Sequence, residues 1–173
     1  LPLPGVDMDH VFQLWTLDDM DAIDHYLHAN PVRTAAVIGG GFIGLEMAEN
    51  LLEAGVQTTV IEMFDQVLPP LDIEMASAAH ETLKEHGIRL ELSSKVTAFA
   101  DSDGKLIVTL DPKDSIKCDF AILSVGVKPD NKVARDADLE LNDRGGIITN
   151  ESLQSSDEDI YAVGDAIQTT DIT

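Results

Sequence analysis

The chain has 173 residues, of which 44% are hydrophobic, and its 32 acidic residues against 11 basic ones give a formal net charge of -21. This length is enough for one domain with a sizeable core, while the acidic surface argues against binding to nucleic acids or anionic membranes. We expect no membrane span, because no apolar run approaches the roughly 18 residues that a span needs. We also expect no secretory leader, because the sequence shows no basic segment followed by an apolar one.

Cysteine and histidine usage limits the chemistry that the chain can offer. The single cysteine, Cys118, opens an apolar strand-like run and cannot form an internal disulfide, so we expect a buried structural thiol. This usage favours a reducing compartment, and we expect a cytoplasmic protein. The acidity is compatible either with solubility or with a high-salt cytoplasm. The histidines show no metal-ligand spacing, so we expect solvated positions and no metal site (His10, His25, His28, His80 and His86).

The first half of the chain alternates predicted strands and helices. Residues 1–9 form an irregular lead-in, and Thr16 caps a helix that ends near Asn30, since the residue before proline avoids helical geometry. Apolar runs and helical periodicity then predict a regular succession of elements. These are a strand at 34–38, a helix at 42–54, a strand at 58–61, a helix at 72–85 and a strand at 88–92.

The second half changes character. Two alternating runs, 95–99 and 106–110, flank a turn and predict an antiparallel hairpin. A strand at 120–125 follows, and short strands are predicted at 146–149 and 160–163. The sequence therefore predicts an α/β fold: a Rossmann-like parallel sheet with helices, and an antiparallel β-meander insertion that replaces a crossover helix.

A glycine-rich turn lies between the strand at 34–38 and the helix at 42–54, where phosphate-binding turns of dinucleotide sites occur. Gly39 permits the tight turn, Gly41 lets the backbone approach a pyrophosphate, and Gly44 lets the helix pack closely on the strand. The helix N-terminus faces the negative charge. The alternative is a plain strand-to-helix turn.

Glu62 ends the second strand, about 20 residues beyond the glycines, where an acid accepts hydrogen bonds from an adenosine ribose. A carboxylate there repels the 2′-phosphate of NADP, and residues 63–65 supply no lysine or arginine to receive it. The pattern therefore predicts NAD(H) as the cofactor. The alternative for Glu62 is a solvated strand-end residue.

Four blocks, at 37–46, 60–62, 124–130 and 160–166, resemble the pyridine nucleotide-disulfide oxidoreductase family, and most of all its NADH oxidases, NADH peroxidases and coenzyme A-disulfide reductases. The resemblance implies an FAD domain interrupted by an inserted NAD(H) domain. Residues 1–30 are then the lead-in and linker helix from the FAD domain, 31–150 the NAD(H)-binding domain, and 151–173 the start of the return to the FAD domain. It also implies a redox cysteine upstream of residue 1 and a dimerisation domain beyond residue 173.

Family roles carry over to matching positions. The resemblance implies that the glycine turn holds the pyrophosphate, that Glu62 holds the ribose and that Ile43 belongs to the cofactor site. Phe42 then covers the nicotinamide pocket or, alternatively, packs on the sheet. Glu46 lies near the nicotinamide or is an exposed helix charge. Gly126 contacts the nicotinamide ribose or amide or, alternatively, is a plain strand-end glycine. Asp165 binds the ribityl chain of FAD.

The resemblance implies a domain that positions NADH for hydride transfer to FAD in a larger, homodimeric parent enzyme. Its partners are NADH and the remainder of the parent, and the chain alone, which has no catalytic residue of its own, is expected to be inactive. One alternative is a stand-alone dinucleotide-binding or interaction module, which leaves the motif at 164–165 unexplained. Another is a complete NAD-dependent dehydrogenase, which would need a positioned acid or base.

Overall fold

A computed structural model of the chain describes residues 2–126 and 129–168. The chain forms two compact units, Leu1–Val125 and Gly126–Thr173, and each is described by itself. Residues 127 and 128, which belong to the third of the four sequence blocks, lie outside the described residues.

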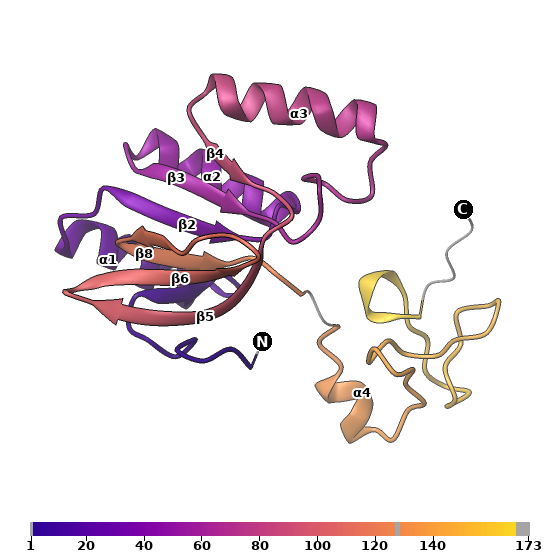
Figure 1. The fold of residues 1–173 in the computed structure, drawn as a ribbon. Helices are drawn as coiled ribbons and strands as arrows, with labels where there is room; N and C mark the ends of the chain where they lie inside the picture. Colours follow the sequence, from indigo (N-terminus) through magenta and orange to yellow (C-terminus); the bar gives the residue numbers. More distant parts are fainter. Residues whose placement is uncertain (1, 127–128, 169–173) are drawn as a thin grey trace. The chain divides into compact units, whose positions relative to one another are not determined.

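A five-stranded parallel sheet is the centre of the first unit (Figure 1). All neighbouring strands in it are parallel. The strands predicted at 34–38, 58–61, 88–92 and 120–125 are confirmed to within a few residues. Strand β1 was not predicted, because three residues carry too short a pattern to recognise. In spatial order the strands are β1 (Val11–Gln13), β8 (Phe120–Leu123), β2 (Thr34–Ile38), β3 (Gln57–Ile61) and β4 (Arg89–Glu91).

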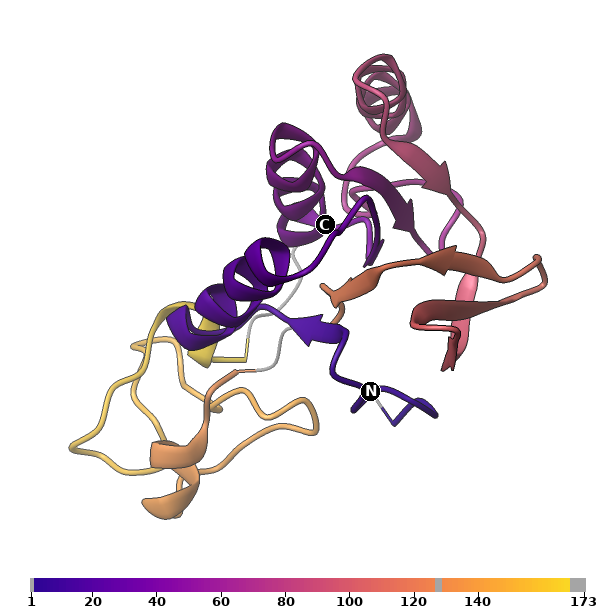
Figure 2. The same cartoon turned by 90° about the vertical axis from the view of Figure 1, so that its left-hand side faces the viewer.

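Three helices cover one face of this sheet, as Figure 2 shows: α1 (Leu17–Ala29), α2 (Phe42–Glu53) and α3 (Ile73–Glu85). Helix α1 begins with the predicted cap, a reciprocal pair of hydrogen bonds between Thr16 and Asp19, and its C-cap is Asn30. Alternate sheet residues face the helices and bury their side chains against them. This core cluster contains Ile23, Ala35, Val37, Ala48, Leu51, Val60, Phe120 and Ile122.

A three-stranded antiparallel sheet covers the other face. It consists of β5 (Lys95–Ser102), β6 (Lys105–Asp111) and β7 (Ile116–Cys118) in that order. Its side chains pack against the sheet residues that point away from the helices, among them Ala36, Ile38 and Ala121. Because these strands connect β4 to β8, they replace a crossover helix, and the predicted α/β fold with its meander insertion is confirmed.

Asp119 marks the corner between β7 and β8. Its carboxylate accepts hydrogen bonds from the Thr34 hydroxyl, at 2.8 Å, and from the backbone N–H groups of Arg33 and Thr34, and it pairs with Lys105. Burial alone would raise the pKa of Asp119, but these hydrogen bonds outweigh burial and lower the pKa to about 2. One buried acid therefore ties together the starts of β2, β6 and β8.

The second unit is mostly irregular. It contains α4 (Lys132–Asp136), a 3-10 turn at Gly164–Ala166 and a small core of Ala134, Leu139 and Ile147. The strands predicted at 146–149 and 160–163 are wrong: these segments make only isolated bridges, such as Ile147 to Leu141 and to Ile167. The reason is that no extended partner runs beside either segment for more than one residue pair.

The boundary between the compact units, after Val125, differs from the sequence-based boundary at residue 150. Residues 129–150 add no strand to the parallel sheet, and some of them pack with residues of 160–166. Which domain of a parent enzyme each segment belongs to stays a prediction.

The environments of the thiol and the histidines are mixed. Cys118 is a buried free thiol, as predicted, and burial raises its pKa to about 12. The expectation of five solvated histidines is wrong in part: His25, His28 and His86 are exposed, but His10 and His80 are partly buried.

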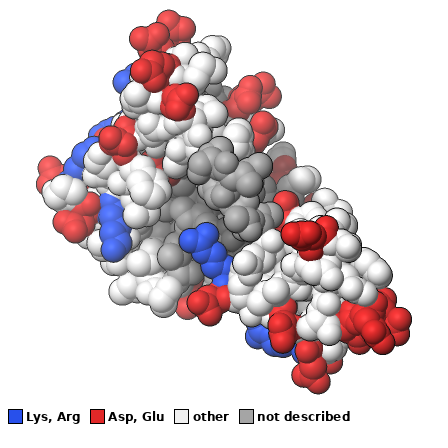
Figure 3. Space-filling view, turned by 90° about the vertical axis from the view of Figure 1, so that its right-hand side faces the viewer, with Lys and Arg blue, Asp and Glu red and all other residues white. Residues whose placement is uncertain are grey.

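The surface keeps the acidic character that the composition predicts. Carboxylates are visible over much of the face drawn in Figure 3, and basic side chains are few there. Within the described ranges, no helix is both long enough and apolar enough to cross a membrane.

Candidate functional site

The carboxyl ends of three neighbouring parallel strands meet at one edge of the sheet. Gly39 follows β2, Glu62 follows β3 and Ser124 follows β8. The chain winds from β2 toward β3 and β4 on one side, while β8 and β1 lie on the other side of β2. Ligands of open parallel sheets bind where the winding direction reverses, outside the carboxyl ends. The glycine turn therefore lies at the expected position of a binding crevice.

At two glycines of the turn, an added Cβ would collide with the protein's own backbone. Gly39 has a φ of 111°, and a Cβ there would lie 2.7 Å from the carbonyl oxygen of Ser124. A Cβ on Gly44 would collide with the carbonyl oxygen of Gly39. These two positions let β2, β8 and α2 approach one another closely.

Gly41 is different, because nothing in the protein lies within 4 Å of the place that its Cβ would take. It is also the N-cap of α2, without a side-chain hydrogen bond, and the first turn of the helix holds no acidic residue. The first N–H groups of a helix lack intrahelical acceptors. Open space and uncapped N–H groups together fit the approach of a pyrophosphate.

Glu62 lies buried beside this turn, with 6% of its surface exposed. One carboxylate oxygen, Oε2, accepts a hydrogen bond from Gly40 N–H at 2.7 Å, and the other, Oε1, accepts one from Phe64 N–H at 3.0 Å. Each oxygen keeps a second lone pair for a ligand hydroxyl. The carboxylate is thus held at the glycine turn by backbone groups, a contact that sequence spacing alone does not predict.

A loop of residues 62–71, here called the Glu62 loop, connects β3 to α3. Its backbone bonds to the turn that follows β4, through Ser93 N–H to Phe64 O at 2.7 Å and Ser94 N–H to Glu62 O at 2.9 Å. Another bond joins it to the glycine turn, from Leu68 N–H to Gly40 O at 2.8 Å.

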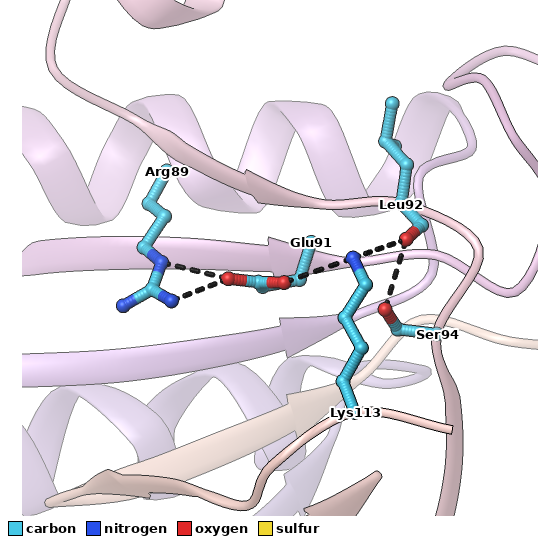
Figure 4. A network of polar contacts seen from close by, with 5 residues as sticks. All are labelled: Arg89, Glu91, Leu92, Ser94 and Lys113. Atoms are coloured by element: carbon cyan, nitrogen blue, oxygen red, sulfur yellow. Dashed lines mark hydrogen bonds and ion pairs between the residues drawn. The ribbon is translucent and has the colours of Figure 1, made fainter. Parts of the chain in front are cut away.

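Polar contacts fix the turn after β4 in its place (Figure 4). Lys113 donates to Glu91 Oε2 at 3.1 Å and to the Leu92 carbonyl oxygen at 2.6 Å, and Arg89 donates to the other oxygen of Glu91. Burial would raise the pKa of Glu91, but the hydrogen bonds from these two cations lower it. These contacts of Arg89, Glu91 and Lys113 fix the turn after β4, and that turn supports Glu62 through its backbone.

Three predicted site residues lie at the start of α2. Phe42 is 67% exposed and Ile43 is 44% exposed, so neither packs on the sheet, which removes the alternative considered for Phe42. Glu46 is exposed on the wall of a hollow between α2 and α3, with Leu45, Leu52 and Leu83. Contacts of Phe42 and Glu46 with a nicotinamide, and of Ile43 with the cofactor, stay predictions.

The two remaining predicted residues belong to the second unit. Gly126 is exposed, with a φ of 81° and open space around its Cβ position, and Asp165 is exposed on the 3-10 turn. Both line one hollow of that unit, together with Arg135 and Arg144. Their relation to the glycine turn stays a prediction.

Sequence reasoning missed two residues beside this edge. His80, on α3, accepts a hydrogen bond from Val67 N–H at 3.0 Å, and Ser124 Oγ is buried without a hydrogen-bond partner among the described residues. Neither belongs to a recognisable motif, because each contact joins segments that meet only in the fold. In residues 2–126 and 129–168, no three His, Cys, Asp or Glu side chains are grouped so that they could hold a metal ion.

Comparison with known proteins agrees with this geometry. The model of the pyridine nucleotide-disulphide oxidoreductase family matches residues 1–172. The chain is 36% identical to the NADH oxidase of Methanocaldococcus jannaschii over 171 residues, covering 98% of this chain and 38% of that protein.

Solved structures are similar over nearly all of the chain. They include the reduced CoADR-RHD protein of Bacillus anthracis, with a TM-score of 0.88 and 42% identity, covering 96% of this chain and 30% of that one. The water-forming NADH oxidase of Lactobacillus brevis bound to NADH has a TM-score of 0.87 and 29% identity, with 96% and 36% covered. A variant of that enzyme with five substitutions, an engineered NADPH oxidase bound to NADPH, has a TM-score of 0.84, 29% identity and the same coverage.

The chain thus spans 30–38% of the length of these relatives. A glycine turn with an open, uncapped helix N-terminus lies beside a buried strand-end glutamate, and the family match covers nearly every residue. The chain belongs to the pyridine nucleotide-disulphide oxidoreductase family.

Proposed function

We propose that this chain is the NAD(H)-binding domain of a larger FAD-dependent oxidoreductase. The main support for this proposal is the empty space at Gly41, next to the uncapped start of α2 and the carboxylate of Glu62. In this proposal the α2 N–H groups bind the pyrophosphate and Glu62 accepts hydrogen bonds from the adenosine ribose. A flavin held by the rest of the parent enzyme would supply the electron chemistry, and this chain orients the nicotinamide toward it.

The preference for NADH over NADPH is a finer part of the proposal. Residues 62–72 contain three acids and no lysine or arginine, so the charges of this segment would repel a 2′-phosphate. The engineered NADPH oxidase supports this assignment by spacing. Its substitutions replace a glycine, an aspartate eighteen residues later and a proline seven residues beyond the aspartate. In this chain, Gly44, Glu62 and Pro69 are separated by the same numbers of residues.

The substitutions in that variant also indicate what the site would need to accept NADPH. They replace the aspartate by alanine, and the residue after it, together with the proline, by arginine. The corresponding positions by spacing are Glu62, Met63 and Pro69. Removal of a carboxylate and addition of guanidinium groups is the change that a bound phosphate favours.

The remaining site residues complete the proposal. Phe42, which is exposed at the start of α2, and Glu46 flank the nicotinamide half of the cofactor, and Ile43, exposed beside Phe42, contacts the cofactor. Gly126 contacts the nicotinamide ribose or amide, and Asp165 binds the ribityl chain of FAD once the rest of the parent is present. The proposal assigns no turnover of NADH to the chain alone.

Calorimetric titration of the purified protein with NADH and with NADPH tests this function. We expect NADH to bind at least about tenfold more tightly than NADPH. Bound NADPH would lose one ribose hydrogen bond and gain one charge repulsion, which together exceed about 1.4 kcal/mol. Glu62→Ala should narrow this ratio, and Glu62→Ala combined with Met63→Arg should invert it. Glu49→Ala, an exposed acid on α2, is the matched control and should leave both affinities unchanged.

Two results would overturn the proposal: no binding of either nucleotide, or tighter binding of NADPH by the wild type. NADH oxidation by the chain without added FAD would contradict the assignment of the redox chemistry to the flavin side.

A further inference from the structure

His80 and Val67 form a contact that the nucleotide site described above does not use. His80 lies in the middle of α3, and its Nε2 accepts a hydrogen bond from the backbone N–H of Val67 at 3.0 Å. Val67 is fully buried. A buried N–H group needs an acceptor, and here an imidazole nitrogen provides it.

Val67 belongs to the part of the Glu62 loop that lies against the glycine turn. A Cβ on Gly40 would come within 3.0 Å of the Val67 side chain, and the next residue, Leu68, donates to Gly40 O at 2.8 Å. Gly40 in turn donates to Glu62 Oε2 at 2.7 Å. Three consecutive hydrogen bonds, at Val67, Leu68 and Gly40, thus run from α3 through the loop to the carboxylate.

We propose that His80 is a positioning residue for the adenosine side of the NADH site, and that only its neutral ring holds the Glu62 loop in the shape that binds the cofactor. This inference rests on the proposed function. The ring acts through the loop, since its hydrogen bond is with Val67 rather than with any residue assigned to the nucleotide.

The contact depends on protonation for a simple chemical reason. Nε2 accepts a hydrogen bond only while it carries no proton, because both ring nitrogens of a protonated histidine are donors. Protonation would place N–H against N–H and leave the buried Val67 group without an acceptor. Acid should therefore loosen the loop even though it adds no charge to the nucleotide site itself.

The charges around His80 set the direction of this effect. Burial first, and then the positive charge of Lys84 one turn further along α3, lower the pKa of His80. On the facing loop, Glu62 is engaged by the N–H groups of Gly40 and Phe64, and Asp65 is exposed. With its pKa lowered below the usual 6.5, His80 is neutral at pH 7.5, and its hydrogen bond is lost as the pH falls through the lowered value.

The test measures NADH affinity of the protein by calorimetry between pH 7.5 and pH 5.0. We expect the wild-type affinity to fall about fivefold to tenfold over this range, the size of one buried hydrogen bond. His80→Gln places an amide oxygen where Nε2 lies, so it should keep the affinity and lose the pH dependence. His80→Leu should bind weakly at every pH. His86→Gln, on an exposed ring that contacts its own helix at Thr82 O, is the matched control.

A second measurement does not require the cofactor. Hydrogen exchange of the peptide spanning 63–71, expressed as protection factors, should show loss of protection at low pH in the wild type and in His86→Gln but not in His80→Gln. Equal pH profiles of binding and protection in the wild type and His80→Gln would overturn the role of His80 alone. No NADH binding by the wild type, with loop protection that still follows His80, would overturn the proposed function and with it the role in cofactor binding.

Discussion

Gly41 and Gly44 belong to the same glycine turn, but only one of them lies tight against the protein's own backbone. The place of a Cβ on Gly44 is taken by the carbonyl oxygen of Gly39, whereas the place of a Cβ on Gly41 is empty. A sequence match to the glycine pattern treats both positions alike. The structure distinguishes Gly44, which allows close packing within the protein, from Gly41, which leaves space for a ligand.

Alanine substitutions at these two positions should have opposite effects. Gly41→Ala should shift the melting temperature by less than about 4 °C, since alanine in place of a glycine N-cap costs up to about 1 kcal/mol, yet weaken NADH binding at least about tenfold. Gly44→Ala should destabilise the protein by about 2 kcal/mol or more, because α2 must move away from β2. Thermal unfolding and calorimetry measure both, and unchanged NADH affinity in Gly41→Ala would contradict the assignment.

Among the elements, the corner at Asp119 decides how the two sheets join. The sequence predicts a strand at 120–125 and no separate strand before it. The structure divides the apolar run from 116 to 123 at Asp119, so that β7 completes the antiparallel sheet and β8 enters the parallel one. The acid stays ionised in a buried place because Lys105, Thr34 and two backbone N–H groups bind it.

This corner should make stability depend on acid. An Asp with a pKa lowered to about 2 contributes stability above the pKa of an unfolded Asp, near 4, and loses it as the pH falls toward 2. Asp119→Asn should therefore lower the free energy of unfolding at pH 7 by on the order of 1–2 kcal/mol and reduce the difference between pH 7 and pH 3. Urea unfolding at both pH values measures this. Asp114→Asn, exposed in the loop before β7, is the control and should behave as the wild type.

Elements with long or well-capped patterns were predictable from the sequence, and contacts across the fold were not. The helix at Thr16 and the strand before Gly39 carry local signals, a capping box and a buried run before glycines. The segment at Ile147 carries a similar apolar signal, but a strand needs an extended partner, and the chain offers only single bridges there. The bond between His80 and Val67 joins a helix to a loop thirteen residues away and leaves no pattern in either segment.

At the scale of the whole molecule, each hydrophobic core lies within one compact unit. Both large clusters draw on residues before Val125, and the small one on residues after Gly126. Strand β8, which pairs with both β1 and β2, is the last element of the parallel sheet. A unit that contains its own sheet, helices and core should fold without the rest.

Truncation tests where the domain ends. A chain that stops at Val125 should unfold cooperatively within about 5 °C of a chain that stops at Asn150, since neither lacks a sheet strand. A chain that stops at Leu110 lacks β7 and β8 and should not fold. Circular dichroism melts compare the three. A stable 1–150 fragment next to an unfolded 1–125 fragment would instead favour the boundary at residue 150.

The buried position of Cys118 makes this chain well suited to fluorescent labelling. It is the chain's one cysteine, and with a pKa raised to about 12 its thiol stays protonated at neutral pH. Maleimide dyes react with thiolates, so the native protein should give almost no background. A cysteine introduced at Met63, which is 59% exposed in the Glu62 loop, would then carry the only dye in the molecule. Its emission would report the arrival of a nucleotide, and the movement of that loop, in real time.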